Sequence, residues 1–537
     1  MAQESQEAGG DMSSDYFKHR RRIVKAGLAA GSLFAPLPYA WVWAQQQSEG
    51  ALKLVRVPKI ALVIGNAKYP ESPLRNPVND ARGIADELKA LGFEVNLKLD
   101  AGRKDMIAAI QAFGADLVKK KGVGVFYYAG HGAQLAWKNY LIPVDAEIEK
   151  IEDMQAKTVE LNSLLDALIK AQNPMNVIIL DACRDNPFGS KVRSQQKGLS
   201  QFDAPPGSLL AYATSPGNTA ADGDGANGLY TENLLRELKV PEARIEDVFK
   251  RVRLAVRRKT DGQQIPWEST SLEEDFWFIP PKEIKRLSEE EAQRLFQEEL
   301  ALWEKIKESK DPKPLEDYLR RYPSGKFTEI AQLQLERALA AQGEKKIQVA
   351  SSAGNPFTKG STVANTAYKV GDTYTFRILD LRTRAEKRQA TQTVQQITDS
   401  EVIFDSGLIT DLLGNVLKAG DGRRWTPRQQ LPLEYSVGRQ WHSRFMNVTH
   451  EENQGVVDLD CKIVARESIT VPAGTFNAFR IEASGPAVFK DRTDISRITR
   501  WMAPDQVRRN IAYDEILIRQ GKIVFGERFE LVSFKQS

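Results

Sequence analysis

The sequence predicts three successive parts: a mostly parallel α/β sheet with helices on both faces, a short helical segment, and an all-β C-terminal domain. From about residue 54, short apolar β-branched runs alternate with stretches of helical periodicity, which is typical of a parallel sheet. A charged, helix-favouring stretch follows two consecutive prolines, and turn-rich β runs fill the chain beyond residue 367. A chain of 537 residues is also too long for a single domain with one hydrophobic core.

The elements of the first part can be read in order from apolar runs and helical periodicity. A strand at 59–65 is followed by a helix at 79–91, with Asn79 or Asp80 placed to cap it. One apolar run ends at His131 within Ala129–Gly130–His131–Gly132, and another ends at Asp181–Ala182–Cys183. The other predicted strands are 93–95, 123–128, 140–143 and 208–213, the other helices are 104–118, 162–170, 230–238 and 245–257, and 276–279 closes the unit.

The boundaries after this unit follow from composition. The α/β part is predicted to span residues 54–280 and to be followed by a helical spacer at 281–343. Within the spacer, two helices around a turn at 321–325 resemble a single tetratricopeptide-type unit, which is too short to stand alone and is therefore interpreted as packing. Ser, Gly, Thr and Asn predict a linker at 344–366, and residues 367–537 are predicted to form a β domain with a binding or targeting role.

Composition excludes some functions. Charged residues make up 27% and hydrophobic residues 42%, as in ordinary globular proteins, and a net charge of +4 gives no sign of nucleic-acid binding. Two cysteines far apart predict no disulfide framework. His442 and His450 lack a carboxylate or cysteine cluster at ligand spacing, so no metal site is predicted there, and Cys461 is interpreted as a strand residue.

Residues 1–44 are predicted to be a cleavable export signal. Arg20 and Arg21 form a pair that precedes an apolar stretch, which resembles a twin-arginine signal. Pro36 and Pro38 interrupt that stretch and favour a signal peptide over a membrane anchor. The sequence therefore predicts a periplasmic or secreted bacterial protein with no stable membrane span once the signal is removed.

The two strand ends present the residues of a nucleophile and its base. The carboxyl ends of parallel strands are where ligands bind in open α/β sheets. His131 follows one such run and Cys183 ends another, 52 residues later. An imidazole that accepts the thiol proton is the usual means of activating a cysteine. We therefore predict that His131 and Cys183 form a catalytic dyad.

The same motifs carry a family resemblance. Tyr128–Gly132 followed by Asp181–Cys183 resembles the caspase-like cysteine peptidases, within them the metacaspase and bacterial orthocaspase branch. The similarity begins with Lys59–Gly65 and Leu74–Ala81, resumes at Tyr212–Gly217, and covers residues from about 57 to 280. It implies a caspase-like fold and a cysteine endopeptidase, with the amides of Gly132 and Cys183 as oxyanion donors. Gly132 would also let the loop approach the substrate without a Cβ.

The resemblance also implies a preference for basic substrates. Asp181 stands two residues before the nucleophile, where caspases carry glutamine, and Asp80 resembles the pocket acid of metacaspases. Asp222 falls near the position of a caspase pocket arginine. Carboxylates buried in a specificity pocket favour a substrate side chain that carries a positive charge. We therefore expect protein or peptide substrates cleaved after arginine or lysine, and self-cleavage in the loop 186–208, which contains Lys191, Arg193 and Lys197.

Cofactor dependence and alternative functions stay open. The sequence requires no cofactor. Calcium activation is common in metacaspases, but the spacing of the acids after the histidine loop does not support it here, and Ser190 stands where a further acid would be expected beyond the cysteine. The acids after the histidine loop are Asp145, Glu147, Glu149, Glu152 and Asp153. One alternative is a catalytically silent envelope protein whose β domain binds a partner. Another is a legumain-like or clostripain-like peptidase of the same clan.

Overall fold

The computed structural model describes residues 50–183, 198–218, 225–284, 287–345, 347, 349–448 and 455–537, with only the backbone of Cys183. The predicted signal, residues 1–44, and the predicted pocket residue Asp222 lie outside the described residues, as do Lys191, Arg193 and Lys197. All described residues belong to one compact unit, Gln47–Ser537. Within them, no helix combines the length and apolar character needed to cross a membrane.

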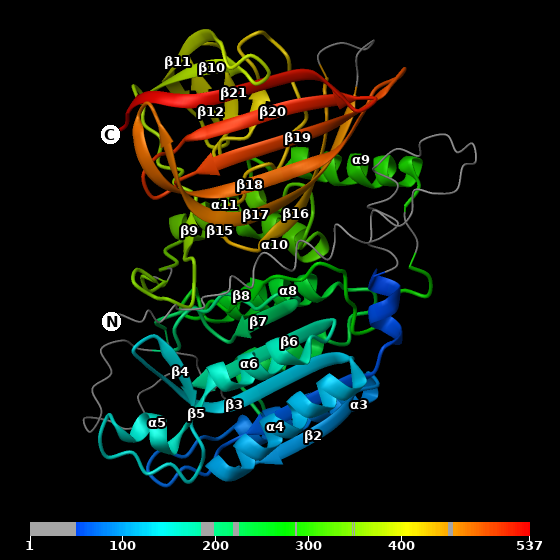
Figure 1. The fold of residues 1–537 in the computed structure, drawn as a ribbon, viewed down its shortest axis with the longest axis vertical. Helices are drawn as coiled ribbons and strands as arrows, with labels where there is room; N and C mark the ends of the chain where they lie inside the picture. The colour runs from blue at the N-terminus through cyan, green and yellow to red at the C-terminus, as the bar shows by residue number, and fades with distance from the viewer. Residues whose placement is uncertain are drawn as a thin grey trace, which may run out of the picture. The chain divides into compact units, whose positions relative to one another are not determined.

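The first part of the chain forms a mostly parallel sheet, as predicted, with eight strands among the described residues (Figure 1). Its main strands pair in the order β2-β1-β3-β6-β7-β8, and only β7 and β8 pair antiparallel. The short strands β4 and β5 extend from β3. The bounds are β1 Lys59–Gly65, β2 Glu94–Leu99, β3 Val123–Leu135, β4 Lys138–Leu141, β5 Val159–Glu160, β6 Met175–Cys183, β7 Ser208–Tyr212 and β8 Trp267–Thr270.

Helices cover both faces of this sheet because its strands are apolar on both sides. On one face, Val125, Tyr127, Val177 and Ile179 share a core with the helices α3, α7 and α8. On the other face, alternate residues of the same strands share a core with α4 and α6. The helices are α3 Pro77–Ala90, α4 Arg103–Lys120, the short α5 Asp153–Lys157, α6 Leu161–Ala171, α7 Leu229–Glu237 and α8 Ile245–Lys259.

Helix α3 begins earlier than predicted, and neither Asn79 nor Asp80 caps it. Asn76 is its N-cap residue without a side-chain hydrogen bond, and Pro77 follows at the first helical position. Proline is favoured there because its fixed φ suits a helix and its missing N–H is not needed. The prediction of a cap at Asn79 or Asp80 was therefore wrong, and the carboxylate of Asp80 is available for another contact.

The helical segment shares its core with the β domain. Helices α9 Glu289–Ile306, α10 Pro312–Arg321 and α11 Thr328–Ala341 follow one another along the chain. Their buried side chains, among them Trp303 and Leu315, join strand residues such as Phe376 and Leu531 in a single hydrophobic cluster. Ser288 and Glu291 form a capping box at the start of α9. The helices are thus part of the packing of the C-terminal region.

The C-terminal region is an antiparallel sheet of eleven strands, in the order β14-β13-β12-β11-β10-β21-β20-β19-β18-β17-β16 (Figure 1). The short strands β9 and β15 form a separate pair. The bounds are β9 Ser361–Val363, β10 Thr373–Asp380, β11 Glu386–Ile397, β12 Glu401–Phe404, β13 Ile409–Asp411, β14 Val416–Lys418, β15 Glu434–Ser436, β16 Gln440–Met446, β17 Val456–Val471, β18 Gly474–Val488, β19 Thr493–Met502, β20 Ala512–Arg519 and β21 Lys522–Lys535.

The segment predicted as a linker makes specific contacts with the α/β part. The backbone N–H of Ala350 donates to the carbonyl of Pro216 at 3.0 Å. The Asp203 carboxylate accepts from the hydroxyl of Thr358 at 2.6 Å, and the ring of Phe357 stacks on Phe202 at 4.7 Å. Polar composition indicated a loop here, but these pairings lie more than 130 residues apart and leave no local signal.

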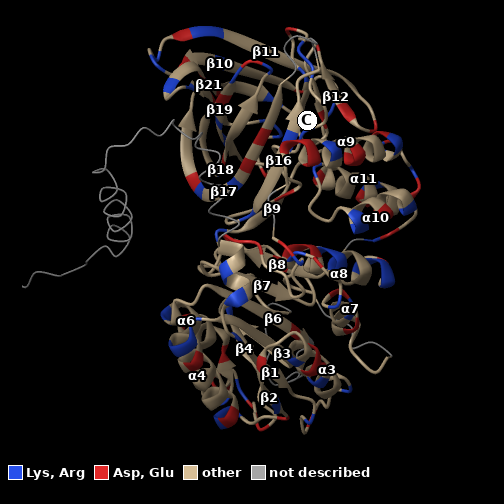
Figure 2. Cartoon of the chain, turned by 90° about the vertical axis from the view of Figure 1, so that its right-hand side faces the viewer, with Lys and Arg blue, Asp and Glu red and all other residues tan. Residues whose placement is uncertain are grey.

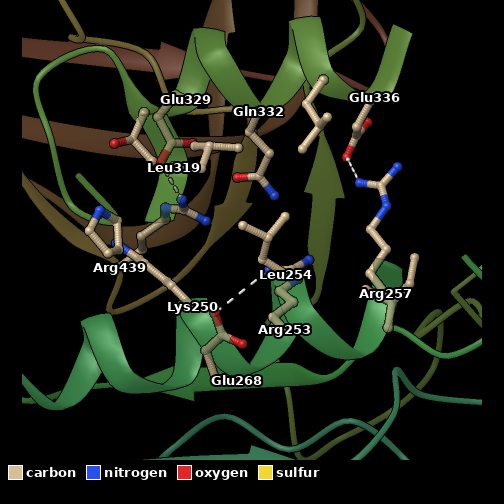
Figure 3. Close-up of a pocket in the computed structure, with 14 residues that line it drawn as sticks. Lys250, Arg253, Leu254, Arg257, Glu268, Leu319, Glu329, Gln332, Glu336 and Arg439 are labelled. Carbon is tan, nitrogen blue, oxygen red and sulfur yellow. Dashed lines mark hydrogen bonds and ion pairs between the residues drawn. The ribbon is translucent and has the colours of Figure 1, made fainter. Parts of the chain in front are cut away.

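Ion pairs join α8 to the C-terminal region. Basic residues, blue in Figure 2, recur along α8. Arg253 pairs with Glu434 and Glu268, and Arg257 pairs with Glu344 and Glu336. Several of these groups line a small cavity of about 60 Å³ between α8 and α11 (Figure 3). None of its lining residues belongs to the ends of β3 or β6, so this cavity is separate from the predicted catalytic centre.

Candidate active site

The parallel pairing of β3 with β6 brings the two predicted catalytic positions together. Ala129 lies opposite Asp181, Gly130 opposite Ala182, and His131 opposite Cys183. Neighbouring strands are about 4.8 Å apart, so the two backbones are adjacent at this point. β3 continues to Leu135 because it leaves the main sheet and pairs antiparallel with β4, where Gly132 lies opposite Leu141. His131 is therefore a strand residue, held on both sides.

The imidazole of His131 is buried and fixed in orientation. Its Nε2 lies 2.7 Å from the carbonyl oxygen of Ser72. Because a carbonyl only accepts, Nε2 carries the proton, and Nδ1 of the neutral ring is left as the acceptor nitrogen. The ring of Tyr69 packs against the imidazole at 4.4 Å, and the Tyr69 hydroxyl accepts from the His131 N–H at 3.0 Å. The hydroxyl of Tyr128 donates to the His131 carbonyl at 2.7 Å.

The two glycines beside His131 allow neighbouring side chains to pack closely against β3. Gly130 has φ of 153°, and a Cβ there would lie 2.7 Å from the Tyr69 hydroxyl and 2.8 Å from that of Tyr128. A Cβ on Gly132 would lie 3.0 Å from the Cβ of Ala182 and 3.1 Å from Leu199. Gly132 was expected to clear space for substrate, but a Cβ at this position would face the side chains of Ala182 on β6 and of the core residue Leu199. Close packing of β3 on its neighbours explains this glycine.

Asp181 is bound by two hydroxyl groups that the sequence did not identify. Its Oδ2 accepts from the Thr231 hydroxyl at 2.6 Å and from the Tyr127 hydroxyl at 3.4 Å. The hydroxyls of Tyr127 and Thr231 lie 2.6 Å apart, and both residues are fully buried. Thr231 comes from α7, about 50 residues further along the chain. The carboxylate at the end of β6 is therefore held by neighbouring secondary structure elements.

Asp80 lies close to the same site. It is buried in the first turn of α3, and its Oδ1 accepts from the side-chain amide of Asn227 and from the N–H of Gly228, both at 2.9 Å. Gly228 is the N-cap residue of α7, so Asp80 caps a helix other than its own. Burial raises the pKa of Tyr127 far above its usual value, and the charges of Asp181 and Asp80 raise it further. Both acids therefore act on one buried tyrosine.

The loop after β7 adjoins the predicted linker. Pro216 accepts a hydrogen bond from Ala350, and a Cβ on Gly217 would lie 2.4 Å from the Cβ of Ala350. The side-chain amide of Asn218 donates to the Ser215 hydroxyl at 3.2 Å. The sequence motif Tyr212–Gly217 therefore contacts the segment that leads into the β domain.

Cys461 and the acids considered as calcium ligands make contacts within the fold. Cys461 is buried in β17, and burial raises the pKa of its thiol well above its ordinary value, which disfavours a thiolate. Asp145 accepts from the N–H of Arg103, and Asp153 accepts from the N–H groups of Glu149 and Lys150. Among the residues that the structure describes, no group of three His, Cys, Asp or Glu side chains is arranged to hold a metal ion. His450 and Ser190 lie outside them.

Comparison with known proteins relates the first part of the chain to one family. Residues 58–277 match the family model of the caspase domain. Human mucosa-associated lymphoid tissue lymphoma translocation protein 1 is 34% identical over 128 residues, which are 24% of this chain and 15% of that protein, and its mouse homologue gives the same values. The chain thus spans only a small part of these relatives. The crystal structure of the Drosophila initiator caspase Dronc aligns with 41% of this chain and 83% of its own, at 14% identity and a TM-score of 0.31.

Proposed function

We propose that this chain, which carries a caspase-like cysteine peptidase domain at residues 58–277, is an endopeptidase that cleaves after arginine or lysine through Cys183 and His131. The observation that carries the proposal is the register of β3 and β6, which sets His131 opposite Cys183. The domain assignment supports proteolysis in general. The identity of the dyad and the substrate preference are inferences from the arrangement of the described residues.

The first step would transfer the thiol proton of Cys183 to Nδ1 of His131 as the sulfur attacks the substrate carbonyl carbon. The hydrogen bond from Nε2 to Ser72 supports this role because it keeps Nδ1 unprotonated in the neutral ring. The resulting imidazolium would then protonate the leaving amine, which leaves an acyl-enzyme that water hydrolyses. No third catalytic side chain is needed, since a backbone carbonyl orients the imidazole.

The tetrahedral intermediate carries a negative oxygen that needs N–H donors. We assign this role to the amides of Gly132 and Cys183, because Gly132 directly follows His131, the residue of β3 that pairs with Cys183 at the end of β6. Backbone donors held by strand pairing need little reorganisation during the reaction. The close packing of Gly132 against Ala182 and Leu199 supports a rigid position for this amide.

The preference for basic residues rests on Asp181 and Asp80. Both are held by donors from the start of α7 or its first turn, namely Asn227, Gly228 and Thr231. The charges of both carboxylates raise the pKa of the buried Tyr127, which supports a negatively charged pocket here. A guanidinium or ammonium group of the substrate would neutralise it, whereas an aspartyl side chain would be repelled.

Self-cleavage is a further part of the proposal, because Lys191, Arg193 and Lys197 follow the nucleophile closely. We expect mass spectrometry of the purified wild-type chain to find a cut after one of them. The Cys183→Ala chain, purified in parallel, should remain intact. A cut that persists in Cys183→Ala would have been made by another protease.

We also propose export by the twin-arginine-type signal and a binding role for the β domain in the cell envelope, both of which rest on sequence. A fusion of residues 1–44 to a reporter that is active only outside the cytoplasm tests the signal. Replacement of Arg20 and Arg21 by lysine should abolish export, and unchanged export would refute the assignment.

A panel of fluorogenic peptides that end in arginine, lysine, asparagine or aspartate tests the specificity. The wild-type chain should cleave the arginyl and lysyl peptides only, and Cys183→Ala should cleave none. Assays with calcium and with a chelator decide whether calcium activates the enzyme. Cleavage after aspartate would overturn the pocket assignment, cleavage after asparagine would favour a legumain-like peptidase, and inactivity of the folded protein on all peptides would favour the silent scaffold.

A further inference from the structure

Three arginines of the β domain lie close together, and none of them forms an ion pair with a carboxylate that the structure describes. Arg500 is on β19, Arg509 is in the turn between β19 and β20, and Arg428 is in the segment between β14 and β15. Arg500 and Arg509 are 9% and 6% exposed, and Arg428 is half-buried. We name Arg428, Arg500 and Arg509 the arginine cluster.

The side-chain oxygens that accept hydrogen bonds from Arg500 and Arg509 belong to neutral amides. Arg500 donates to the side-chain oxygens of Asn510 at 3.2 Å and Gln430 at 2.9 Å, and Arg509 donates to Gln392 at 3.2 Å. Within the described part of the chain, the Nε atoms of all three arginines are buried without a hydrogen-bond partner. No ion pair joins any of the three to a described carboxylate, although Glu515 and Asp411 act on Arg428 from a longer range.

Two half-buried arginines of the same domain are paired with acids. Arg508 contacts Asp372 at 2.6 Å, and Arg528 contacts Asp514 at 2.9 Å and Glu530 at 2.6 Å. A buried guanidinium without a counter-charge is strongly unfavourable, so proteins rarely retain one without a purpose. Among the described residues, the cluster therefore differs from Arg508 and Arg528 in having no paired carboxylate.

Aromatic rings orient the guanidinium planes. The guanidinium of Arg428 lies 4.6 Å from the ring centre of Trp425 and 5.0 Å from that of Phe445. Arg500 lies 4.9 Å from Tyr513, and Arg509 lies 5.1 Å from Phe404. A ring against the flat face leaves the N–H edge for hydrogen bonding, which suits the oxygens of a carboxylate or phosphate.

The three cations converge on Tyr513. Burial and Glu515 raise the pKa of Tyr513, whereas Arg500, Arg509 and Arg428 all lower it. Burial and, after it, the charge of Arg500 lower the pKa of Arg428 to about 10. The cations therefore repel one another across a short distance, and a bound anion would relieve that repulsion.

From this geometry we propose that Arg428, Arg500 and Arg509 form a binding site for an oxyanion group, either a carboxylate or a phosphate, carried by a ligand of the β domain. The site is independent of the proposed peptidase activity. It would give the C-terminal domain a recognition function of its own.

Isothermal titration of the full-length Cys183→Ala chain with sodium phosphate and with sodium succinate tests this site, with sodium chloride at equal ionic strength as the reference. At least one of the two anions should bind saturably, and the one that binds more tightly identifies the chemistry. Arg428→Gln and Arg500→Gln should each weaken binding ~tenfold or more, because a charge-assisted hydrogen bond is lost.

Arg497→Gln is the matched control, since Arg497 is exposed on the same strand as Arg500. It removes the same charge and should leave binding unchanged. The proposal fails if neither anion differs from chloride, or if Arg497→Gln weakens binding as much as the cluster variants do. If Arg500→Gln does not fold, anion binding by Arg428→Gln alone tests the proposal, because Arg428 is half-buried.

Discussion

Asp181 and Thr231 show how single residues set the chemistry of the proposed specificity pocket. The carboxylate stands at the end of β6, and the hydroxyl of Thr231 on α7 holds one of its oxygens at 2.6 Å. A carboxylate that accepts hydrogen bonds from fixed donors keeps its charge and its direction. The donor therefore contributes to substrate preference, even though it carries no charge itself.

Thr231→Val tests this contribution, because it keeps the side-chain volume and removes the hydroxyl. We expect kcat/KM for an arginyl peptide to fall ~tenfold and the free energy of unfolding to fall by about 1 kcal/mol. Thr410→Val is the control: Thr410 is fully buried, and among the described residues its hydroxyl has no hydrogen-bond partner. Equal losses in both variants would show that Thr231 acts by packing alone.

The sequence predicted some of these residues and not others. His131 and Cys183 could be found because each closes an apolar run in a distinctive motif. Ser72 could not, because it acts through a backbone carbonyl that any residue would supply. Tyr127 and Thr231 carry ordinary side chains that become part of the site only when β3, β6 and α7 pack together.

At the scale of elements, apolar strands were easier to predict than polar ones. β1 has the predicted bounds because its β-branched residues indicate a strand. β8, Trp267–Thr270, was missed because it has four residues and alternates in burial at the edge of the sheet. β3 runs past its predicted end because its last residues pair with β4, a contact that local periodicity does not record.

The pairing of β16 with β17 supports a pH-dependent contact. Burial alone would raise the pKa of Asp458, but the hydrogen bond from His442 and the charges of Arg444 and Lys326 together lower that pKa to about 2. Nε2 of His442 lies 2.6 Å from Asp458, and Arg444 lies 2.8 Å from it. Because the folded pKa is below the unfolded value, this stabilisation is present above about pH 4 and is lost as the pH falls towards 2.

We expect Asp458→Asn to reduce the free energy of unfolding by about 2 kcal/mol at neutral pH and by about half as much at pH 3. Urea unfolding at several pH values measures the difference. Asp491→Asn, which removes an exposed acid, should have little effect at any pH. A loss from Asp458→Asn that stays constant or grows as the pH falls would contradict the assignment.

At the scale of the whole molecule, the contact of α8 with the C-terminal region is built from charges. Arg253 pairs with Glu434 and Glu268. Arg439 pairs with Glu329 (Figure 3). Burial raises the pKa of Glu268, while the charge of Arg253 opposes this effect. Such a network depends on every partner, because removal of one charge leaves its neighbours buried and uncompensated.

Arg253→Met should therefore lower the free energy of unfolding by about 3 kcal/mol and separate the melting of the two regions in calorimetry. The double variant Arg253→Met/Glu434→Gln should recover part of this loss. Arg236→Gln removes a half-exposed arginine with one neighbouring acid and should cost less than about 0.5 kcal/mol. One unchanged transition in Arg253→Met would show that the network does not couple the regions.

The most direct test of the proposed function is covalent labelling of the full-length chain with peptidyl ketone probes that carry a leaving group and end in arginine or in aspartate. Peptide mapping by mass spectrometry should find the arginyl probe on Cys183 and little label from the aspartyl probe, and His131→Asn should suppress the reaction. Labelling of Cys461 in place of Cys183, or faster reaction with the aspartyl probe, would contradict the account.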